Sequence, residues 1–161
     1  MKRALCIIAA AAVICALLRL FVFHTARITG SSMERTLNGG DVVRVYDLAY
    51  AFGNAPQRGD IVECTFPERS GRYVKRLIGL PGDRIEIREN CVYINGEYLS
   101  ESYVSSVAED YAIQLGADDY FVLGDNRADS YDSRAADMGT LKQKDIHGRV
   151  LMKIAPLRKI K

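Results

Sequence analysis

Three stretches of the chain carry residues that could act together on an amide bond. Each holds a hydroxyl or an amine among turn-forming or strand-forming neighbours: Ser32 in residues 29–37, Lys75 in residues 73–83 and Ser130 in residues 124–134. A single serine after a glycine is weak evidence, because both residue types are common in turns. A hydroxyl and an amine brought together by the fold would supply a nucleophile and a base.

Hydrolysis of an amide needs a nucleophile, a base that takes its proton, and donors that stabilise the oxyanion. The chain has two histidines, and no pattern supports either as the base, although the sequence does not exclude a Ser-His-Asp triad. His24 follows an apolar segment, and His147 has no serine beside it. A lysine can replace histidine if burial lowers its pKa well below about 10.4. Lys75 suits this role, because it lies in an apolar run that predicts a strand.

In this order the three stretches resemble the type I signal peptidases, membrane-bound serine proteases that remove signal peptides from exported proteins. The resemblance extends from Ile28 to Pro156 and fits the short, single-span bacterial form. It implies that Ser32 is the nucleophile, that Lys75 is the general base, and that Ser130 orients the lysine amine by a hydrogen bond. It also implies cleavage after small residues at positions minus one and minus three of the substrate.

The resemblance assigns further residues to supporting and binding roles. Asp132 and Arg134 match a supporting pair beside the site, and Asp125 with Arg76 is expected to brace the same region. The residues expected to bind the substrate in shallow pockets are Ile28, Gly30, Met33, Leu37, Tyr73 and Val74. The oxyanion hole is expected to include the Ser32 N–H. At Gly30 some members have a serine hydroxyl, which this chain lacks.

One position departs from the family pattern Ser-Met-x-Pro-Thr-Leu, because Arg35 stands in place of the proline. Proline fixes its own φ and restrains the preceding residue. We therefore expect a less rigid loop around Ser32, and we expect Arg35→Pro to leave activity unchanged or to raise it.

Arg35 also motivates a second interpretation, a catalytically weak relative that assists surface-protein or pilus assembly. The intact Ser32, Lys75 and Ser130 speak against it. A third interpretation, a self-cleaving Ser-Lys protease of the repressor type, would require a DNA-binding domain where this chain has an apolar segment.

The elements that position these residues begin with residues 4–23, which are apolar except for Arg19. Twenty helical residues span about 30 Å, the thickness of a bilayer core. A removable secretory signal is the alternative, but His24 would occupy position minus three of a cut after Ala26, where a small residue is needed. We expect residues 1–24 to form a tail and a transmembrane signal-anchor. Residues 25–161 would then form an extracytoplasmic catalytic domain.

After Gly40 the pattern changes to short runs of β-favouring residues separated by turn signals, which predicts a mainly β domain. The predicted strands are residues 42–46, 60–66, 73–78, 83–88, 91–94, 98–99, 120–123 and 148–154. A hairpin is predicted at Glu89-Asn90, followed by an Asn95-Gly96 turn. The resemblance implies two antiparallel sheets with a groove-like active site, as in the signal peptidases and the LexA-like proteins.

Composition excludes several classes of partner. The 161 residues include 22 Lys and Arg against 20 Asp and Glu, and no basic run exceeds two residues, so no nucleic-acid partner is predicted. The four cysteines have no metal-binding spacing, so neither a metal nor a cofactor is predicted. Signal peptides and membrane lipid are the expected partners. Whether Cys64 and Cys91 pair, which preproteins are cut, and the oligomeric state stay open.

Overall fold

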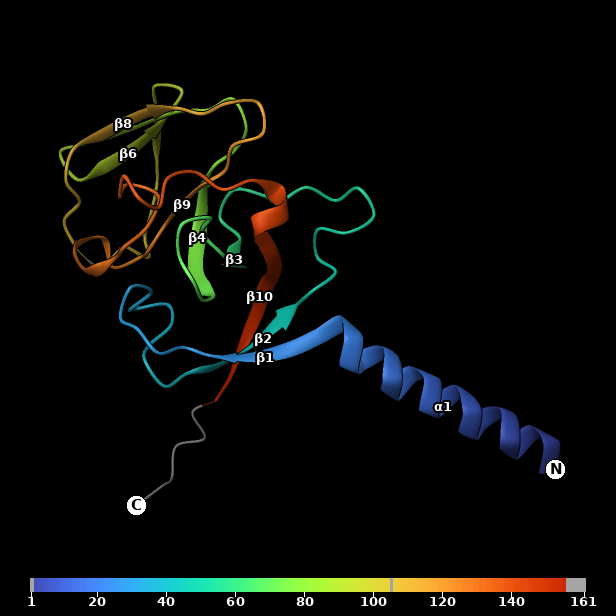
Figure 1. The fold of residues 1–161 in the computed structure, drawn as a ribbon. Helices are drawn as coiled ribbons and strands as arrows, with labels where there is room; N and C mark the ends of the chain where they lie inside the picture. Colours follow the sequence, from blue (N-terminus) through green and yellow to red (C-terminus); the bar gives the residue numbers. More distant parts are fainter. Residues whose placement is uncertain (1, 105, 156–161) are drawn as a thin grey trace, which may run out of the picture.

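The computed structural model describes residues 2–104 and 106–155 (Figure 1). In these residues one α-helix is followed by ten strands and two short 3₁₀ helices. The elements are α1 (Lys2–Val22), β1 (Phe23–Arg27), β2 (Val42–Tyr46), β3 (Ile61–Cys64), β4 (Tyr73–Gly79), β5 (Arg84–Arg88), β6 (Cys91–Ile94), β7 (Glu97–Leu99), β8 (Tyr111–Gln114), β9 (Phe121–Leu123), η1 (Arg127–Asp129), η2 (Gln143–Asp145) and β10 (Ile146–Ala155).

The strands form two sheets in which neighbouring strands are antiparallel. The larger sheet has the order β1-β2-β10-β3-β4-β9, and the smaller has the order β7-β6-β5-β8. In Figure 1 the smaller sheet lies at one end of the larger, and α1 extends away from both. The prediction of a mainly β fold with two antiparallel sheets is confirmed.

Strand β4 connects two hydrophobic cores. Leu77 packs in one cluster with Val62 and Phe66, whereas the next residue, Ile78, packs in a second cluster with Ile85 from the smaller sheet. Because successive side chains of a strand point to opposite faces, β4 is covered on both sides. Its residues from Lys75 to Gly79 are all buried. A polar side chain in this strand is therefore held away from water.

The sequence pattern does not predict β1 or β8. Both are edge strands, β1 in the larger sheet and β8 in the smaller. β1 directly follows α1 and carries polar residues, and β8 has only four residues. Each is a strand because of its pairing, β1 with β2 and β8 with β5, and pairing is not visible in a local pattern.

The predicted hairpin is confirmed by its backbone. Glu89 and Asn90 have φ values of 50° and 65°, so both central residues of the turn between β5 and β6 are left-handed. This is the conformation of the tight turns that match the twist of a hairpin. Asn95 and Gly96, with φ values of 53° and 87°, form the second turn in the same way.

The expected membrane segment falls on α1. Within the residues that the structure describes, no helix combines the length and the hydropathy needed to span a membrane. The side chains of residues 14–21, on which the expectation depends, lie outside the described residues. The expected boundary after residue 24 falls within β1, because this strand begins at Phe23.

The two cysteines of the β domain that could have paired are both free thiols. Cys64 is fully buried in β3 of the larger sheet, and Cys91 is half-buried at the start of β6 in the smaller sheet. Cys64 therefore acts as a small apolar core residue, and burial raises the pKa of its thiol to about 12.

The end of β4 yields a prediction about stability. A Cβ at Gly79 would lie 2.7 Å from Leu115 Cδ1, 2.8 Å from Phe121 Cβ and 2.9 Å from Ile85 Cδ1. We expect Gly79→Ala to lower the free energy of unfolding by about 1–3 kcal/mol, because the core must move to accept the methyl group. Urea unfolding measures this change.

The matched control is Gly39→Ala, whose Cβ would lie 3.7 Å from the nearest atom, the Gly30 carbonyl oxygen, at an ordinary contact distance. Equal loss of stability in the two variants would contradict the packing argument.

Candidate active site

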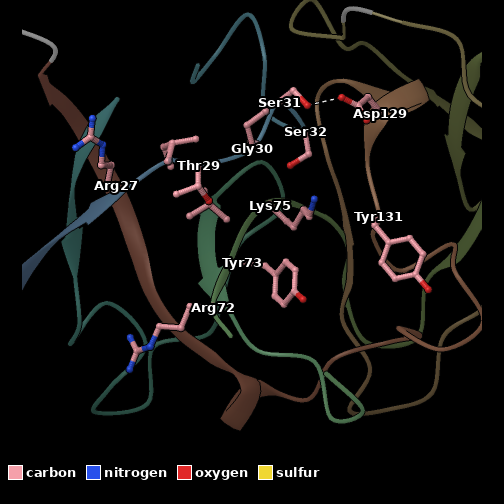
Figure 2. Close-up of a pocket in the computed structure, with 13 residues that line it drawn as sticks. Arg27, Thr29, Gly30, Ser31, Ser32, Arg72, Tyr73, Lys75, Asp129 and Tyr131 are labelled. Carbon is pink, nitrogen blue, oxygen red and sulfur yellow. Dashed lines mark hydrogen bonds between the residues drawn. The ribbon is translucent and has the colours of Figure 1, made fainter. Parts of the chain in front are cut away.

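A pocket of about 360 Å³ lies where three segments of the chain meet. Residues 27–33 and 72–75 line it together with Asp129 and Tyr131. Figure 2 shows Ser32 and Lys75 in this pocket, with the Ser32 hydroxyl and the Lys75 amine directed toward the same space. The pocket thus brings together a hydroxyl from the turn after β1 and an amine from β4.

A compact turn holds Ser32. The Glu34 N–H donates to the Ser31 carbonyl at 2.9 Å, and the Leu37 N–H donates to the Met33 carbonyl at 2.7 Å. The side chains of Met33 and Leu37 are almost fully buried and anchor the turn in a hydrophobic cluster. Ser32 itself is half-buried and lines the pocket. The apolar neighbours of the serine therefore fix its position, while its hydroxyl remains accessible.

Lys75 is 3% exposed, which is rare for a lysine. Its Nζ donates to Ser130 Oγ at 3.1 Å. Burial lowers the pKa of the Lys75 amine, and the negative charge of Asp132 opposes part of this effect. A buried amine with a lowered pKa spends more of its time neutral near physiological pH, and a neutral amine is able to accept a proton.

Gly124 allows the two serine-bearing segments to approach each other. A Cβ at this position would overlap with both Ser130 Oγ and the Ser32 carbonyl oxygen. Any larger residue would push Ser130 or the turn of Ser32 away from the pocket. The glycine that begins the third sequence stretch is therefore explained by a close contact.

An ion pair between the buried Asp132 and the half-buried Arg134 lies next to Ser130. Arg134 Nε donates to Asp132 Oδ1 at 2.8 Å, and its Nη2 donates to Oδ2 at 3.0 Å. Asp132 also accepts the Gly124 N–H at 3.0 Å, and Arg134 donates to the Ser130 carbonyl at 3.2 Å. This pair ties the backbone on both sides of the segment that presents Ser130 to Lys75.

A second buried pair joins β4 to the turn of Ser32. Arg76 donates from Nε and Nη2 to the two oxygens of Asp125, at 2.8 Å and 2.7 Å. Thr36 donates its hydroxyl to the same carboxylate. Arg76 also donates to the Gly59 carbonyl at 3.0 Å. This network links Lys75, through its neighbour in sequence, to the turn that carries the pocket serine.

Comparison with known proteins agrees with this arrangement. The family model described as signal peptidase, peptidase S26, matches residues 1–155. The chain belongs to this family. It is 37% identical to a signal peptidase I of Bacillus licheniformis over 163 residues, covering 94% of this chain and 87% of that protein. It is 34% identical to a signal peptidase I of Leptolyngbya laminosa over 154 residues, covering 89% and 74%.

The fold resembles a solved structure of the same family. A crystal structure of a signal peptidase I from Enterococcus faecalis V583 matches with a TM-score of 0.54 and 39% sequence identity. The match covers 61% of this chain and 97% of that one.

The resemblance to the type I signal peptidases assigns six residues to substrate binding, and the structure places five of them on the pocket. These five are Ile28, Gly30, Met33, Tyr73 and Val74. Leu37 is not among the lining residues, and its side chain packs in the hydrophobic cluster that anchors the turn. The four residues expected to support the site, Arg76, Asp125, Asp132 and Arg134, form the two ion pairs behind the pocket.

The structure adds pocket residues that the sequence argument did not select. They are Arg27, Thr29, Ser31, Arg72, Asp129 and Tyr131. Each is next to a residue to which the sequence analysis assigns a role. Among them, Ser31 donates its hydroxyl to Asp129, a contact that joins two of the segments lining the pocket (Figure 2). Adjacency in sequence was the available signal, but it does not say which side chains face inward.

Both histidines lie away from the pocket. His24 contacts Asp47 and lies 3.2 Å from Glu63 Oε2, and His147 shares a hydrogen bond of 3.0 Å with the Thr65 hydroxyl. Neither is placed to take a proton from Ser32. Among the described residues there is also no group of three or more His, Cys, Asp or Glu side chains that could hold a metal ion.

The backbone at Arg35 contradicts the reasoning behind the expectation for Arg35→Pro, which assumed that a proline would fit this turn. Arg35 has a φ of 77°, in the left-handed region, whereas the proline ring fixes φ near −65°. The turn of this chain is therefore built differently at this point from one that contains proline. Arg35 also donates from Nη1 to the Val104 carbonyl at 3.3 Å, so it contacts the loop after β7.

The left-handed backbone at residue 35 leads to a prediction that reverses the sequence expectation. Arg35→Pro should lower both the melting temperature and any peptidase activity, because the turn must rearrange. Arg35→Gly should keep the melting temperature close to wild type, because glycine adopts a positive φ without strain. Thermal unfolding and cleavage assays on the two variants test this. An Arg35→Pro variant as stable and active as wild type would show that the turn is not constrained at this residue.

Proposed function

We propose that this chain is a membrane-bound serine endopeptidase that removes signal peptides from exported preproteins, with Ser32 as nucleophile and Lys75 as general base. The observation that carries the proposal is the burial of the Lys75 amine in the pocket that Ser32 also lines. This amine donates a hydrogen bond to Ser130 Oγ at 3.1 Å. Membership of the S26 family supports the reaction class. Burial supports the neutral state that a lysine base requires.

In the proposed first step, Ser32 Oγ attacks the carbonyl carbon of the scissile amide while its proton passes to Lys75 Nζ. The electron pair of the carbonyl moves to oxygen, and the Ser32 backbone N–H stabilises the oxyanion. The carbon–nitrogen bond then breaks, and Lys75 returns the proton to the leaving amine, which becomes the N-terminus of the mature protein. An ester between Ser32 and the signal peptide remains.

In the second step a water molecule replaces the amine. Lys75 takes a proton from the water, the hydroxide attacks the ester carbon, and the proton returns to Ser32 Oγ as the ester bond breaks. Ser130 serves both steps by holding the amine through its hydroxyl. No further group is needed to balance the reaction, because each proton that Lys75 accepts is given back.

Alanine substitutions test the proposed roles on a purified preprotein. Ser32→Ala and Lys75→Ala should each lower kcat by on the order of 10³-fold or more with the fold retained, because residues that act as a unit lose most of the rate together. Ser130→Ala should cost less, since Ser130 orients the base without reacting. Exposed residues of the same types, Ser100 and Lys144, provide the controls, and their alanine variants should match wild type.

Near wild-type cleavage by either Ser32→Ala or Lys75→Ala would refute the proposed roles. If the wild-type protein itself failed to cleave, the interpretation as a catalytically weak relative would be favoured instead.

Substrate selection is proposed to follow from the two segments that flank Ser32 and Lys75. An extended peptide between residues 26–31 and 73–75 would bind through backbone hydrogen bonds, and its alternate side chains would point into the enzyme. Those side chains are at positions minus one and minus three. Ile28, Met33, Tyr73 and Val74 are bulky walls of the pocket, which leaves room for small side chains.

The substrate pattern follows as a prediction. Replacing alanine by leucine at minus one of a model preprotein should block cleavage, because the side chain meets the pocket wall. The same replacement at minus two should change the rate little, because that side chain points away. Cleavage rates of the two substrates decide the matter, and equal tolerance of both would overturn the proposed binding mode.

The reaction is proposed to take place on the outer side of the cytoplasmic membrane, with residues 4–23 as the anchor. The support is the apolar sequence of that segment and its length of twenty residues. Protease added to intact protoplasts should then digest residues 25–161. Protection of this part until the membrane is permeabilised would contradict the proposed topology.

A further inference from the structure

Asn126 contacts the backbone on both sides of Ser32. Its N–H donates to the Ser32 carbonyl at 3.0 Å, and its side-chain Nδ2 donates to the Ser31 carbonyl at 3.3 Å. These two carbonyls belong to the peptide units before and after the Cα of Ser32. One residue from the third sequence stretch therefore restrains both backbone dihedrals of the pocket serine.

The contact with the Ser31 carbonyl also sets the direction of the Ser32 N–H. The two groups are in the same peptide unit, which is planar and trans, so they point in opposite directions. The Ser31 carbonyl accepts from Asn126 Nδ2 and from the Glu34 N–H, so the Ser32 N–H is directed away from both donors. Within the described part of the chain, no backbone carbonyl accepts a hydrogen bond from this N–H.

Ser106 fixes which way the Asn126 amide is turned. Ser106 Oγ donates to Asn126 Oδ1 at 2.8 Å and accepts the Ala128 N–H at 2.9 Å. Because the Ala128 N–H must donate, the Ser106 hydroxyl proton is left for Asn126 Oδ1. The amide nitrogen of Asn126 then faces the Ser31 carbonyl. Ser106 comes from the loop between β7 and β8, far in sequence from the site.

We propose that Asn126 and Ser106 are positioning residues that aim the Ser32 N–H at the oxyanion. Ser106 orients the Asn126 amide, the amide holds the Ser31 carbonyl, and the rigid peptide unit turns the Ser32 N–H toward the reacting carbonyl oxygen. This inference rests on the proposed function, since it assigns two further residues to the same reaction. It concerns orientation alone, because neither side chain touches the substrate.

The first experiment separates turnover from binding. Asn126→Ala should lower kcat by about 10- to 100-fold, less than loss of an oxyanion donor, while KM stays within about twofold of wild type. Asn126→Asp should lose as much, because a carboxylate oxygen facing the Ser31 carbonyl oxygen has no proton to donate. Ser106→Ala should lose less, and Ser106→Thr, which keeps the hydroxyl, should recover most of the rate. Ser102→Ala, an exposed serine of the same loop, is the control.

The second experiment uses a peptide aldehyde with alanine at its last position. Ser32 Oγ adds to the aldehyde carbon as its proton passes to Lys75 Nζ, the carbonyl electron pair moves to oxygen, and the adduct places that oxygen where the oxyanion forms. Affinity for the aldehyde should fall in Asn126→Ala by the same factor as kcat. Affinity for the matching peptide alcohol, which forms no adduct, should not change. A purely structural loss would weaken both ligands.

The outcomes separate this inference from the proposed function. Cleavage by Ser32→Ala would defeat the proposed function itself, whatever Asn126 does. If wild type cleaves and Ser32→Ala does not, then a folded Asn126→Ala or Asn126→Asp variant with wild-type kcat and aldehyde affinity overturns the inference. If both Asn126 variants fail to fold, Ser106→Ala decides: unchanged kcat and aldehyde affinity reject the positioning role, and a loss reversed by Ser106→Thr supports it.

Discussion

Burial of the Lys75 amine is the constraint on which the rest of this site depends. A charged ammonium group removed from water costs several kcal/mol, on the order of the whole stability margin of a small domain. Strand β4 is covered on both faces, so the amine has Ser130 Oγ as a hydrogen-bond partner in place of bulk solvent. The same burial that makes a lysine unfavourable here lowers its pKa and allows it to act as a base.

The ion pairs behind the pocket can be understood from this constraint. Asp132 alone would favour the protonated form of Lys75, but Arg134 binds both its oxygens and acts in the opposite direction on the lysine. Asp132 therefore holds the Gly124 N–H while Arg134 offsets part of its effect on the pKa of the base. Asp125 is likewise neutralised by Arg76. The paired charges fix the backbone near the amine, and each carboxylate has an arginine that opposes its charge.

Several features of the molecule could be predicted from the sequence. The hairpin at Glu89-Asn90 has a local cause, the left-handed turn, and was therefore visible. The order and content of three stretches match a known family, and this match predicts the two-sheet fold. It also predicts that Ser32, Lys75 and Ser130 lie in one region. A family pattern predicts contacts between segments far apart in sequence, because members of one family share a fold. Local sequence rules do not predict such contacts.

Other features depend on contacts that neither local pattern nor family pattern describes. Arg35 has a left-handed φ, which a proline cannot adopt, and an argument from the rigidity of proline alone does not foresee it. Leu37 is an apolar residue of the motif, and only packing shows that it supports the turn instead of lining the pocket. Ser106 reaches Asn126 from a loop twenty residues away, and nothing in its own neighbourhood marks it.

The titration of Lys75 itself tests the central claim most directly. Lysine labelled at Cε and Nζ can be followed by NMR against pH, with the Lys75 signal assigned by its absence from Lys75→Met. We expect this amine to titrate well below the ordinary lysine value of 10.5, and to return to that value when the protein is unfolded. A Lys75 signal that titrates together with those of the exposed lysines in the folded protein would contradict a neutral lysine base.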